Sequence, residues 1–368
     1  MSVAVRSFAK INLGLCIGPL RPDGFHELRT VYQTIALHDV IRLQVIRGVG
    51  IEIRCEDPRV PTDQSNTCCR IIERAMEALK ARGRVVIEIE KRLPVQGGLG
   101  GASGNAVASL LALELALKKE LSGAEKLRIA AEVGSDLPLF LIGGTVLGVG
   151  RGEEVYPLVD LPAVPCVLAL PELSVSTPQA FRDWDLSLCG AGAPARERLA
   201  ADDQRQNPAE LRSSRTGKSA RPHTSIAQHI RTPAHTSVAE LTGTDSSDRI
   251  DLFSRRLSAW LSSLSGVPVS KGRGRAETPL LDLVRTGIEN DFEKVVFPKY
   301  PELREVKSVL KDAGAVYASL SGSGSAIYGL FRSGNQAKRA AAILTKKGTP
   351  AVATTTLTRP QYWKKMSG

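Results

Sequence analysis

A glycine-rich stretch at residues 94–105 reads Pro94-Val95-Gln96-Gly97-Gly98-Leu99-Gly100-Gly101-Ala102-Ser103-Gly104-Asn105. Residues 85–91 before it have the β-branched bias of a half-buried strand, and residues 106–118 after it are strong helix formers with one apolar stripe. Glycine lets a backbone approach a ligand closely, and a helix start offers unpaired N–H groups and the positive end of the dipole. The stretch therefore predicts a cradle for a polyphosphate, and a glycine-rich connector without a ligand is the alternative.

Two better-known phosphate motifs do not fit this stretch. No Lys-Ser or Lys-Thr pair follows the glycines, as a Walker A loop requires, and no G-x-G-x-x-G pattern can be placed over residues 97–104. The sequence Gly217-Lys218-Ser219 lacks the upstream glycine of a Walker A loop and follows no predicted strand. The stretch is therefore neither a Walker A loop nor a dinucleotide-binding fingerprint.

Composition limits the possible classes of protein. The chain has 368 residues, 42% of them hydrophobic, which is enough for two domains with buried cores. It contains neither an N-terminal signal nor an apolar run of about 18 residues, so we expect a cytoplasmic protein with no membrane partner. The net charge of +11 is spread along the chain, which suits anionic substrates as well as RNA. The six cysteines lack the spacing of zinc sites and are predicted to be small buried side chains.

Two charged residues lie in unusual surroundings. Residues 3–18 alternate as strands interrupted at residues 9–12, so Lys10 is expected where one strand passes to the next, although such a lysine is most often a solvated charge. Asp136 lies between a glycine and the apolar run at residues 137–140. A partly buried carboxylate is costly unless it is paired or functional, and an aspartate that caps a short turn is the alternative.

Local patterns also place a turn and two strands near the N-terminus. The sequence Pro22-Asp23-Gly24 favours a turn that presents Phe25 and His26 at the start of a strand, where they could equally be a core aromatic and an ordinary strand histidine. A second turn is predicted at His38-Asp39, between two strands. Asn66 is predicted to cap a helix.

The character of the chain changes after Trp184. From Asp185 to Leu252 there is no Phe, Trp or Tyr. Such a stretch cannot bury enough apolar area to offset its ordering entropy, so we predict a disordered insertion at about residues 187–248. Residues 359–368 are basic and are expected to fray.

The pattern Pro-x-x-Gly-Gly-Leu-Gly-Gly-x-Ser at residues 94–103 resembles the glycine loop of the GHMP small-molecule kinases, which wraps the triphosphate of ATP. Other stretches resemble one branch of that family, whose alcohol substrate carries a cytidine diphosphate group. They occur in the order of the family's motifs, at residues 9–13, 23–28, 134–140, 174–181, 290–293 and 321–325.

The resemblance implies an α+β fold of two domains. The N-terminal domain, at residues 1–160, would be like domain 2 of ribosomal protein S5, and the C-terminal domain, at residues 161–368, would be ferredoxin-like. The implied function is ATP-dependent phosphorylation of the 2-hydroxyl of a cytidyl diphosphate sugar alcohol in non-mevalonate isoprenoid precursor synthesis, with ATP and Mg²⁺ as cofactors. The partner would be a small molecule and not a nucleic acid, and the protein a monomer or homodimer.

The resemblance also assigns roles to individual residues. Asp136 would be the catalytic base and Lys10 its cationic partner, and the Ser103 hydroxyl would lie near Mg²⁺. Phe25 stands where the family often has Tyr, and Ala102 and Gly104 stand where Gly and Ser are frequent, which puts one phosphate or metal contact in doubt. Residues implied to bind ATP are Pro94, Val95, Gln96, Gly97, Gly98, Leu99, Gly100, Gly101, Ala102, Ser103 and Gly104. Residues implied to bind the alcohol substrate are Asn12, Phe25, His26, Thr177 and Phe181.

Two other functions remain open at the level of sequence. One is a GHMP kinase for another alcohol, such as a mevalonate-type or sugar-like substrate, against which the cytidine-side residues argue. The other is a non-enzymatic RNA-binding protein, because the chain is basic and the expected N-terminal domain resembles a ribosomal-protein fold.

Overall fold

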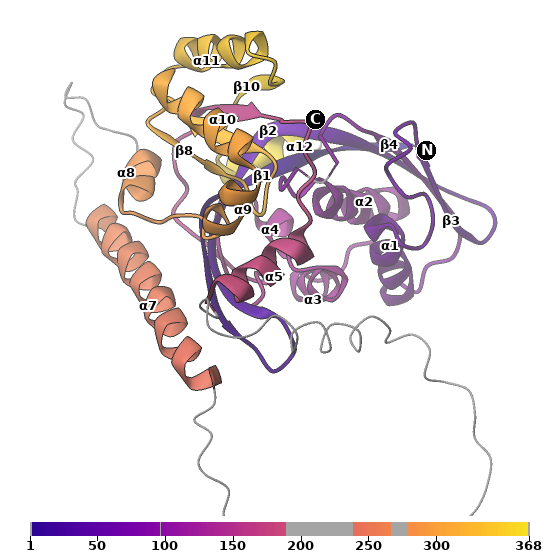
Figure 1. Ribbon diagram of the computed structural model, residues 1–368. Coiled ribbons are helices and arrows are strands. Elements are labelled where there is room, and N and C mark those ends of the chain that lie inside the picture. The colour runs from indigo at the N-terminus through magenta and orange to yellow at the C-terminus, as the bar shows by residue number, and fades with distance from the viewer. Residues whose placement is uncertain (1, 96, 189–237, 266–278, 367–368) are drawn as a thin grey trace, which may run out of the picture.

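The computed structural model describes residues 2–95, 97–188, 238–265 and 279–366 (Figure 1). Its first sheet has six strands in the order β3-β4-β2-β5-β6, with β1 paired to β2. The strands are β1 (Val3–Leu20), β2 (His26–Ile46), β3 (Gly50–Cys55), β4 (Arg84–Glu90), β5 (Thr145–Val149) and β6 (Glu154–Pro157).

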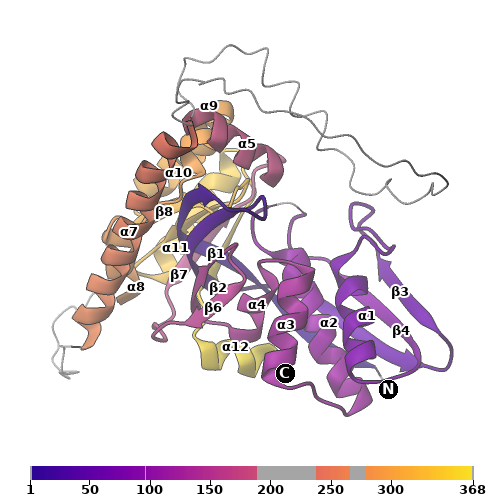
Figure 2. The same ribbon diagram turned by 90° about the horizontal axis from the view of Figure 1, so that it is seen from below.

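Helices gather on one side of this sheet, and their apolar residues form a core with it (Figures 1 and 2). The middle of helix α2, at residues 104–110 and 112–114, is buried, because it lies between the sheet and the neighbouring helices. The helices are α1 (Thr67–Ala78), α2 (Gly101–Leu117), α3 (Gly123–Val133) and α4 (Leu137–Ile142).

The second sheet is antiparallel, with the strand order β10-β7-β9-β8. It consists of β7 (Pro165–Ala169), β8 (Tyr317–Leu320), β9 (Ile327–Leu330) and β10 (Ala351–Thr355). Helices α10 (Pro301–Asp312) and α11 (Gly334–Lys346) pack on it. This order is that of the split βαβ, or ferredoxin-like, arrangement. The predicted α+β fold is therefore confirmed.

The remaining helices surround the junction of the two sheets. They are α5 (Thr177–Leu188), α7 (Val238–Ser265), α8 (Pro279–Arg285), α9 (Glu293–Lys299) and α12 (Arg359–Met366). The long helix α7 runs along one side of the molecule (Figures 1 and 2) and packs on β1. None of the helices in the described ranges is both long and apolar enough to cross a bilayer.

The turn expected at His38-Asp39 is wrong, because β2 runs unbroken through both residues. Strand β1 pairs with β2 on one side, and β4 pairs with β2 on the other, so the ladder continues where the local sequence favours a turn. The interruption expected at residues 9–12 is also not a break. Irregularities of register flank the segment, between Phe8 and Ala9 and between Asn12 and Gly14. Such bulges re-aim side chains without ending a strand.

The insertion expected at residues 187–248 has helical ends, because α5 continues to Leu188 and α7 already begins at Val238. The rest of the predicted insertion, residues 189–237, lies outside the described residues. Helix α7 buries Ile250, Phe253 and Trp260 in a core shared with β1 and β2. The sequence pattern missed the first turns of α7 because they carry no apolar stripe.

The fraying expected for residues 359–368 is wrong for the part that the structure describes. Residues 359–366 form α12, in which Tyr362 is completely buried and donates a hydrogen bond of 2.6 Å to the Phe140 carbonyl oxygen. Helix α12 thereby joins the core of the first sheet, although it follows the last strand of the second. The division at residue 160 stays a prediction, and both α7 and α12 pack across it.

The cysteine prediction is largely confirmed. Cys16, Cys68, Cys69 and Cys166 are buried, Cys55 is partly exposed, and Cys189 lies outside the described residues. Burial raises the pKa of the Cys68 and Cys166 thiols to about 12, so both are uncharged near neutral pH.

Candidate active site

Lys10 and Asp136 form an ion pair in the first domain. Lys10 comes from β1 between the two bulges, and its Nζ lies 3.3 Å from Asp136 Oδ2. The lysine side chain is 4% exposed, whereas the aspartate side chain is 34% exposed, so the pair has a buried cation and a carboxylate open on one side. Among the described contacts, Asp136 makes no capping hydrogen bond to α4, which it precedes. The structure thus favours the paired carboxylate over the turn-capping alternative.

Tyr32 completes this pair and was missed by sequence reasoning. Its hydroxyl donates a hydrogen bond of 3.0 Å to Asp136 Oδ1. Burial, and then the neighbouring carboxylate, raise the pKa of Tyr32 well above its usual value, so the phenol stays a donor. Lysine and tyrosine therefore fix both oxygens of the carboxylate. No local sequence pattern marks Tyr32, and the structure places it on β2 opposite Asn12 of β1.

Asn12 links Lys10 to the interior of the sheet. It lies two residues after Lys10 in β1, and its Oδ1 accepts a hydrogen bond of 2.8 Å from Lys10 Nζ. Its Nδ2 donates to the hydroxyl of Thr30 at 2.8 Å, and that hydroxyl donates to the Gly14 carbonyl oxygen at 2.9 Å. This chain orients the ammonium group towards Asp136.

The glycine loop lines a cavity of about 330 Å³ together with residues 59–61 and 65–68. Gly98 and Gly100 have positive φ angles, of 71° and 67°, and Gly100 is the residue before α2. Lys10 N donates to the Leu99 carbonyl oxygen at 3.0 Å, which places the loop against the Lys10 segment. Of the residues expected to bind ATP, Gln96 lies outside the described ones. Those that line the cavity are Pro94, Val95, Gly97, Gly98, Leu99, Gly100, Gly101, Ala102 and Ser103.

Gly104 is buried in α2 and does not line this cavity. A Cβ at residue 104 would lie 2.9 Å from Ser7 Oγ and 3.0 Å from the Phe8 carbonyl oxygen. The position therefore faces β1 and allows close packing of α2. A missing hydroxyl at residue 104 removes no contact from the cavity wall.

A serine-rich turn from the second domain packs on the glycine loop. It connects β8 to β9 at residues 321–325. Ser321 Oγ donates to the Gly98 carbonyl oxygen at 3.0 Å, and Ala326 N donates to that of Gly97 at 3.2 Å. Asn290 Nδ2 donates to the Leu320 and Gly322 carbonyl oxygens, both at 2.8 Å, and so fixes the turn. The two domains therefore meet at the loop.

Three residues expected on the substrate side form one group at α5. Thr177 begins α5, and its hydroxyl lies 2.7 Å from that of Ser323. Phe181, one turn later, stacks on the His26 ring at a centroid distance of 5.2 Å and an interplanar angle of 12°. His26 Nε2 is 2.8 Å from Asp185 Oδ1, a partner that sequence reasoning missed although it lies four residues after Phe181.

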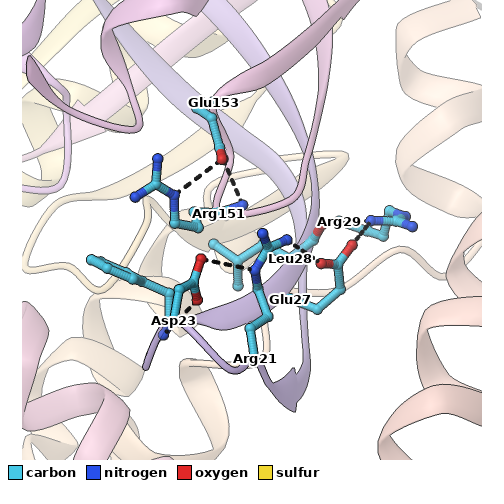
Figure 3. Close-up of polar contacts among 8 residues, drawn as sticks. Arg21, Asp23, Glu27, Leu28, Arg29, Arg151 and Glu153 are labelled. Atoms are coloured by element: carbon cyan, nitrogen blue, oxygen red, sulfur yellow. Dashed lines mark hydrogen bonds and ion pairs between the residues drawn. The ribbon is translucent and has the colours of Figure 1, made fainter. Parts of the chain in front are cut away.

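Phe25 lies apart from the His26–Phe181 stack and is 51% exposed. The Arg151 guanidinium is 5.0 Å from the Phe25 ring centroid, a cation–π contact that sequence reasoning missed. Glu153 accepts from Arg151 Nε at 3.0 Å (Figure 3). Beside them, the β1–β2 turn is tied by the ion pair between Arg21 and Glu27. A guanidinium in this place suits an anionic ligand group.

Ser103, whose hydroxyl was expected near Mg²⁺, is one of the residues that line the cavity. Within the described ranges there is no group of three or more His, Cys, Asp or Glu side chains suited to a metal. Mg²⁺ in phosphate sites is commonly held by one or two protein oxygens together with phosphate oxygens and water. One hydroxyl on the cavity wall is compatible with that kind of site.

The two-domain fold and the loop-lined cavity define a small-molecule kinase of the GHMP class. The model of the GHMP kinases N terminal domain matches residues 66–144, and that of the GHMP kinases C terminal domain matches residues 277–349.

Comparison with individual proteins narrows the class. The chain is 33% identical to a 4-diphosphocytidyl-2-C-methyl-D-erythritol kinase of Solibacter usitatus over 345 residues. This alignment covers 94% of the chain and 86% of the relative. A kinase of the same name from Acaryochloris marina is 32% identical, over 90% of this chain and 87% of its own. A crystal structure of 4-(cytidine 5'-diphospho)-2C-methyl-D-erythritol kinase superposes with a TM-score of 0.63 at 27% identity, covering 96% and 99% of the two chains. The chain belongs to the 4-diphosphocytidyl-2-C-methyl-D-erythritol kinase family, and the predicted resemblance is confirmed.

Proposed function

We propose that this protein transfers the terminal phosphoryl group of ATP to the 2-hydroxyl of 4-diphosphocytidyl-2-C-methyl-D-erythritol, in the non-mevalonate synthesis of isoprenoid precursors. Family membership supports the reaction class and the substrate. The observation that carries the proposal is the Lys10–Asp136 ion pair, which lies where the glycine loop contacts β1.

The Lys10–Asp136 pair supplies the chemistry that phosphoryl transfer needs from a protein, namely positioning and charge neutralisation. Asp136 accepts the proton of the attacking hydroxyl, a role that accelerates reactions by roughly 10²–10⁴-fold. Lys10 pairs with the Asp136 carboxylate and stabilises charge on the transferred group. Residues 94–103 hold the triphosphate, and Ser103 would hold Mg²⁺, which would neutralise phosphate charge.

The substrate end of the site combines aromatic and charged groups. Phe181 and Phe25 offer ring faces for the cytosine, and His26, oriented by Asp185, offers a polar edge. Arg151 supplies positive charge for the diphosphate. Asn12 and Thr177 complete the proposed set of substrate-binding residues. We further propose that the protein is a cytoplasmic monomer or homodimer without a nucleic-acid partner.

A coupled assay of ADP release, run with and without the cytidyl substrate, tests this function. Turnover that requires 4-diphosphocytidyl-2-C-methyl-D-erythritol is expected. Turnover with a mevalonate-type or sugar-like alcohol alone would assign the protein to another GHMP activity. Salt-dependent retention of RNA without any ATP turnover would support the non-enzymatic alternative.

The Phe181→Ala variant tests the nucleobase end. Loss of one stacking face, worth roughly 1–3 kcal/mol in nucleic-acid sites, should raise KM for the cytidyl substrate about tenfold and leave KM for ATP unchanged. His26→Ala should have the same effect and also reduce discrimination between cytidine and uridine analogues. If both variants instead weakened ATP binding, the two ligands would occupy exchanged positions.

A further inference from the structure

The carboxylate of Asp39 is completely buried in β2, next to the glycine loop. It accepts four hydrogen bonds, two at each oxygen. Oδ1 accepts from the backbone N–H groups of Arg92 and Leu93, both at 2.7 Å. Oδ2 accepts from Lys91 Nζ at 2.6 Å and from Asn105 Nδ2 at 3.0 Å. Every donor comes from outside β2.

These donors flank the glycine loop on both sides. Residues 91–93 lead from β4 into the loop, and Asn105 follows it in the first turns of α2. One carboxylate therefore ties together the two ends of the segment at residues 94–104. Fixing the ends of a flexible loop reduces the ordering entropy that a ligand must overcome on binding.

An ion pair with the buried Lys91 does not by itself explain why Asp39 accepts four hydrogen bonds. An ion pair with Lys91 requires one carboxylate oxygen, yet the other oxygen is occupied by two successive backbone amides. Replacing a buried ion pair by apolar side chains is often neutral or stabilising, so the pair alone adds little to stability. The two amide hydrogen bonds fix the path of the backbone.

The network also reaches the wall of the cavity. Lys91, Gly101 and Asn105 line it, and Lys91 Nζ would be 3.5 Å from a Cβ placed on Gly101. Asn105 is 4% exposed, and its Oδ1 has no hydrogen-bond partner among the described residues. Asp39 thus fixes the amide nitrogen of a residue in the cavity wall, while the buried oxygen of that amide is left without a partner.

We propose that Asp39 is a positioning residue for the glycine loop, acting through Lys91, the 92–93 backbone and Asn105. The inference rests on the proposed function in one respect, that ATP binds at this loop. Asp39 does not touch the ligand. It holds the two ends of the loop at the separation in which the cavity is open.

Asp39→Asn tests the proposal. Asparagine keeps the shape of the aspartate side chain but places an NH₂ group against the hydrogen-bond donors that surround residue 39. We expect KM for ATP to rise about tenfold, KM for the cytidyl substrate to stay within about twofold, and amide hydrogen exchange at residues 97–104 to accelerate. The double variant Asp39→Asn with Asn105→Asp exchanges the carboxylate and the amide. It should restore most of the protection of the loop amides from exchange, whereas its new carboxylate lies in the cavity wall and should keep KM for ATP high.

Glu114→Gln is the matched control. Glu114 is a 7% exposed carboxylate near the other end of α2, and it accepts from Leu121 N at 2.7 Å and from Lys126 Nζ at 3.2 Å. It should lower thermal stability without changing KM for ATP or exchange in the loop. If Asp39→Asn behaved like Glu114→Gln, Asp39 would be a structural residue only and the proposal would be overturned.

Hydrogen exchange separates this proposal from the proposed function. If the wild-type protein neither binds nor turns over ATP, the proposed function fails, while faster loop exchange in Asp39→Asn still supports positioning. If Asp39→Asn does not fold, the exchanged double variant decides. A folded double variant with a protected loop supports the proposal, and an unfolded one overturns it in favour of a general structural role.

Discussion

At the scale of single residues, the candidate site depends on a carboxylate held at both oxygens. Lys10 contacts Asp136 Oδ2 and Tyr32 donates to Oδ1, while about a third of the aspartate side chain stays open. A base held in this way needs little reorganisation before it accepts a proton.

The Asp136→Asn variant should lose turnover while it retains nucleotide. The amide keeps the shape of the side chain but has no basicity, so kcat should fall by about 10²–10⁴-fold, with Kd for ATP within a few fold of the wild-type value. Single-turnover kinetics and calorimetric ATP titration measure the two effects. Asp312→Asn, at an exposed position at the end of α10, is the control that should change neither. Near-normal turnover in Asp136→Asn would remove this residue from the role of base.

The Tyr32→Phe variant should slow turnover and preserve the shape of the alkaline pH profile. Loss of a hydrogen bond to a charged group costs roughly 1.5–3 kcal/mol, which corresponds to about a tenfold or larger fall in kcat. Because burial and Asp136 raise the pKa of Tyr32, the phenol is protonated throughout the neutral and moderately alkaline range and should not titrate there. Rates from pH 6 to about pH 10 would check this.

Tyr317→Phe is the matched control for Tyr32→Phe. Its hydroxyl lies within hydrogen-bond distance of the backbone oxygens of Leu13, at 3.2 Å, and Ile288, at 3.1 Å, and can donate to one of them. This variant should leave kcat unchanged. Disappearance of an alkaline limb in Tyr32→Phe would contradict the assignment of a protonated phenol.

At the scale of elements, the contact between the glycine loop and the serine-rich turn joins the two domains. Gly98 has a φ angle of 71°, and a Cβ there would lie 2.0 Å from the Ser321 carbonyl oxygen. No side chain fits, because the obstructing atom belongs to a backbone that Asn290 holds in place.

Gly98→Ala should therefore weaken ATP binding and lower the melting temperature. The left-handed conformation costs a non-glycine residue roughly 1–2 kcal/mol, and the clash adds to that by forcing the loop away from the turn. Gly123→Ala is the control, since Gly123 begins α3 and a Cβ there meets nothing within 4 Å. Equal melting temperatures and equal KM values for ATP in the two variants would contradict this account of the contact.

At the scale of the whole molecule, the segments that follow the predicted insertion are part of the fold. Helix α7 contributes Ile250, Phe253, Leu257 and Trp260 to a core that also contains residues of β1 and β2. The core of the first sheet, in turn, includes residues of α12. Each of these two cores therefore includes a helix that is distant in sequence from the strands of the first sheet that it packs on.

Replacing residues 191–236 by a flexible linker of about twenty residues should preserve folding and activity, because it removes none of the described core residues. Loop-closure entropy changes slowly with length, so stability should shift by about a kcal/mol. A longer replacement that also removes α7 should unfold the protein, since loss of one buried Trp alone costs roughly 3–5 kcal/mol. Circular dichroism and the coupled assay distinguish the two. Unfolding of the shorter variant would show that residues 191–236 contribute to the core.

The sequence by itself determined the features whose chemistry is local. The glycine loop, the Ala9–Leu13 run with Lys10 and the Gly134–Phe140 run with Asp136 are each recognisable from neighbouring residues. The first turn of α2 was missed, because its two glycines have low helix propensity. In the structure Gly104 packs on β1 and Phe140, and Gly101 faces Lys91 and Leu93.

The tertiary structure alone decided which distant residues meet. Asp39 looked like a turn residue, yet its partners lie more than fifty positions away along the chain, at Lys91, Arg92, Leu93 and Asn105. Tyr32 and Asp185 gave no local signal either, and their partners are 104 and 159 residues distant. Local preferences depend on adjacent side chains, whereas these contacts depend on how apolar faces from the whole chain pack together. The sequence therefore determined the chemical groups of the site, and only packing decided what holds each of them in place.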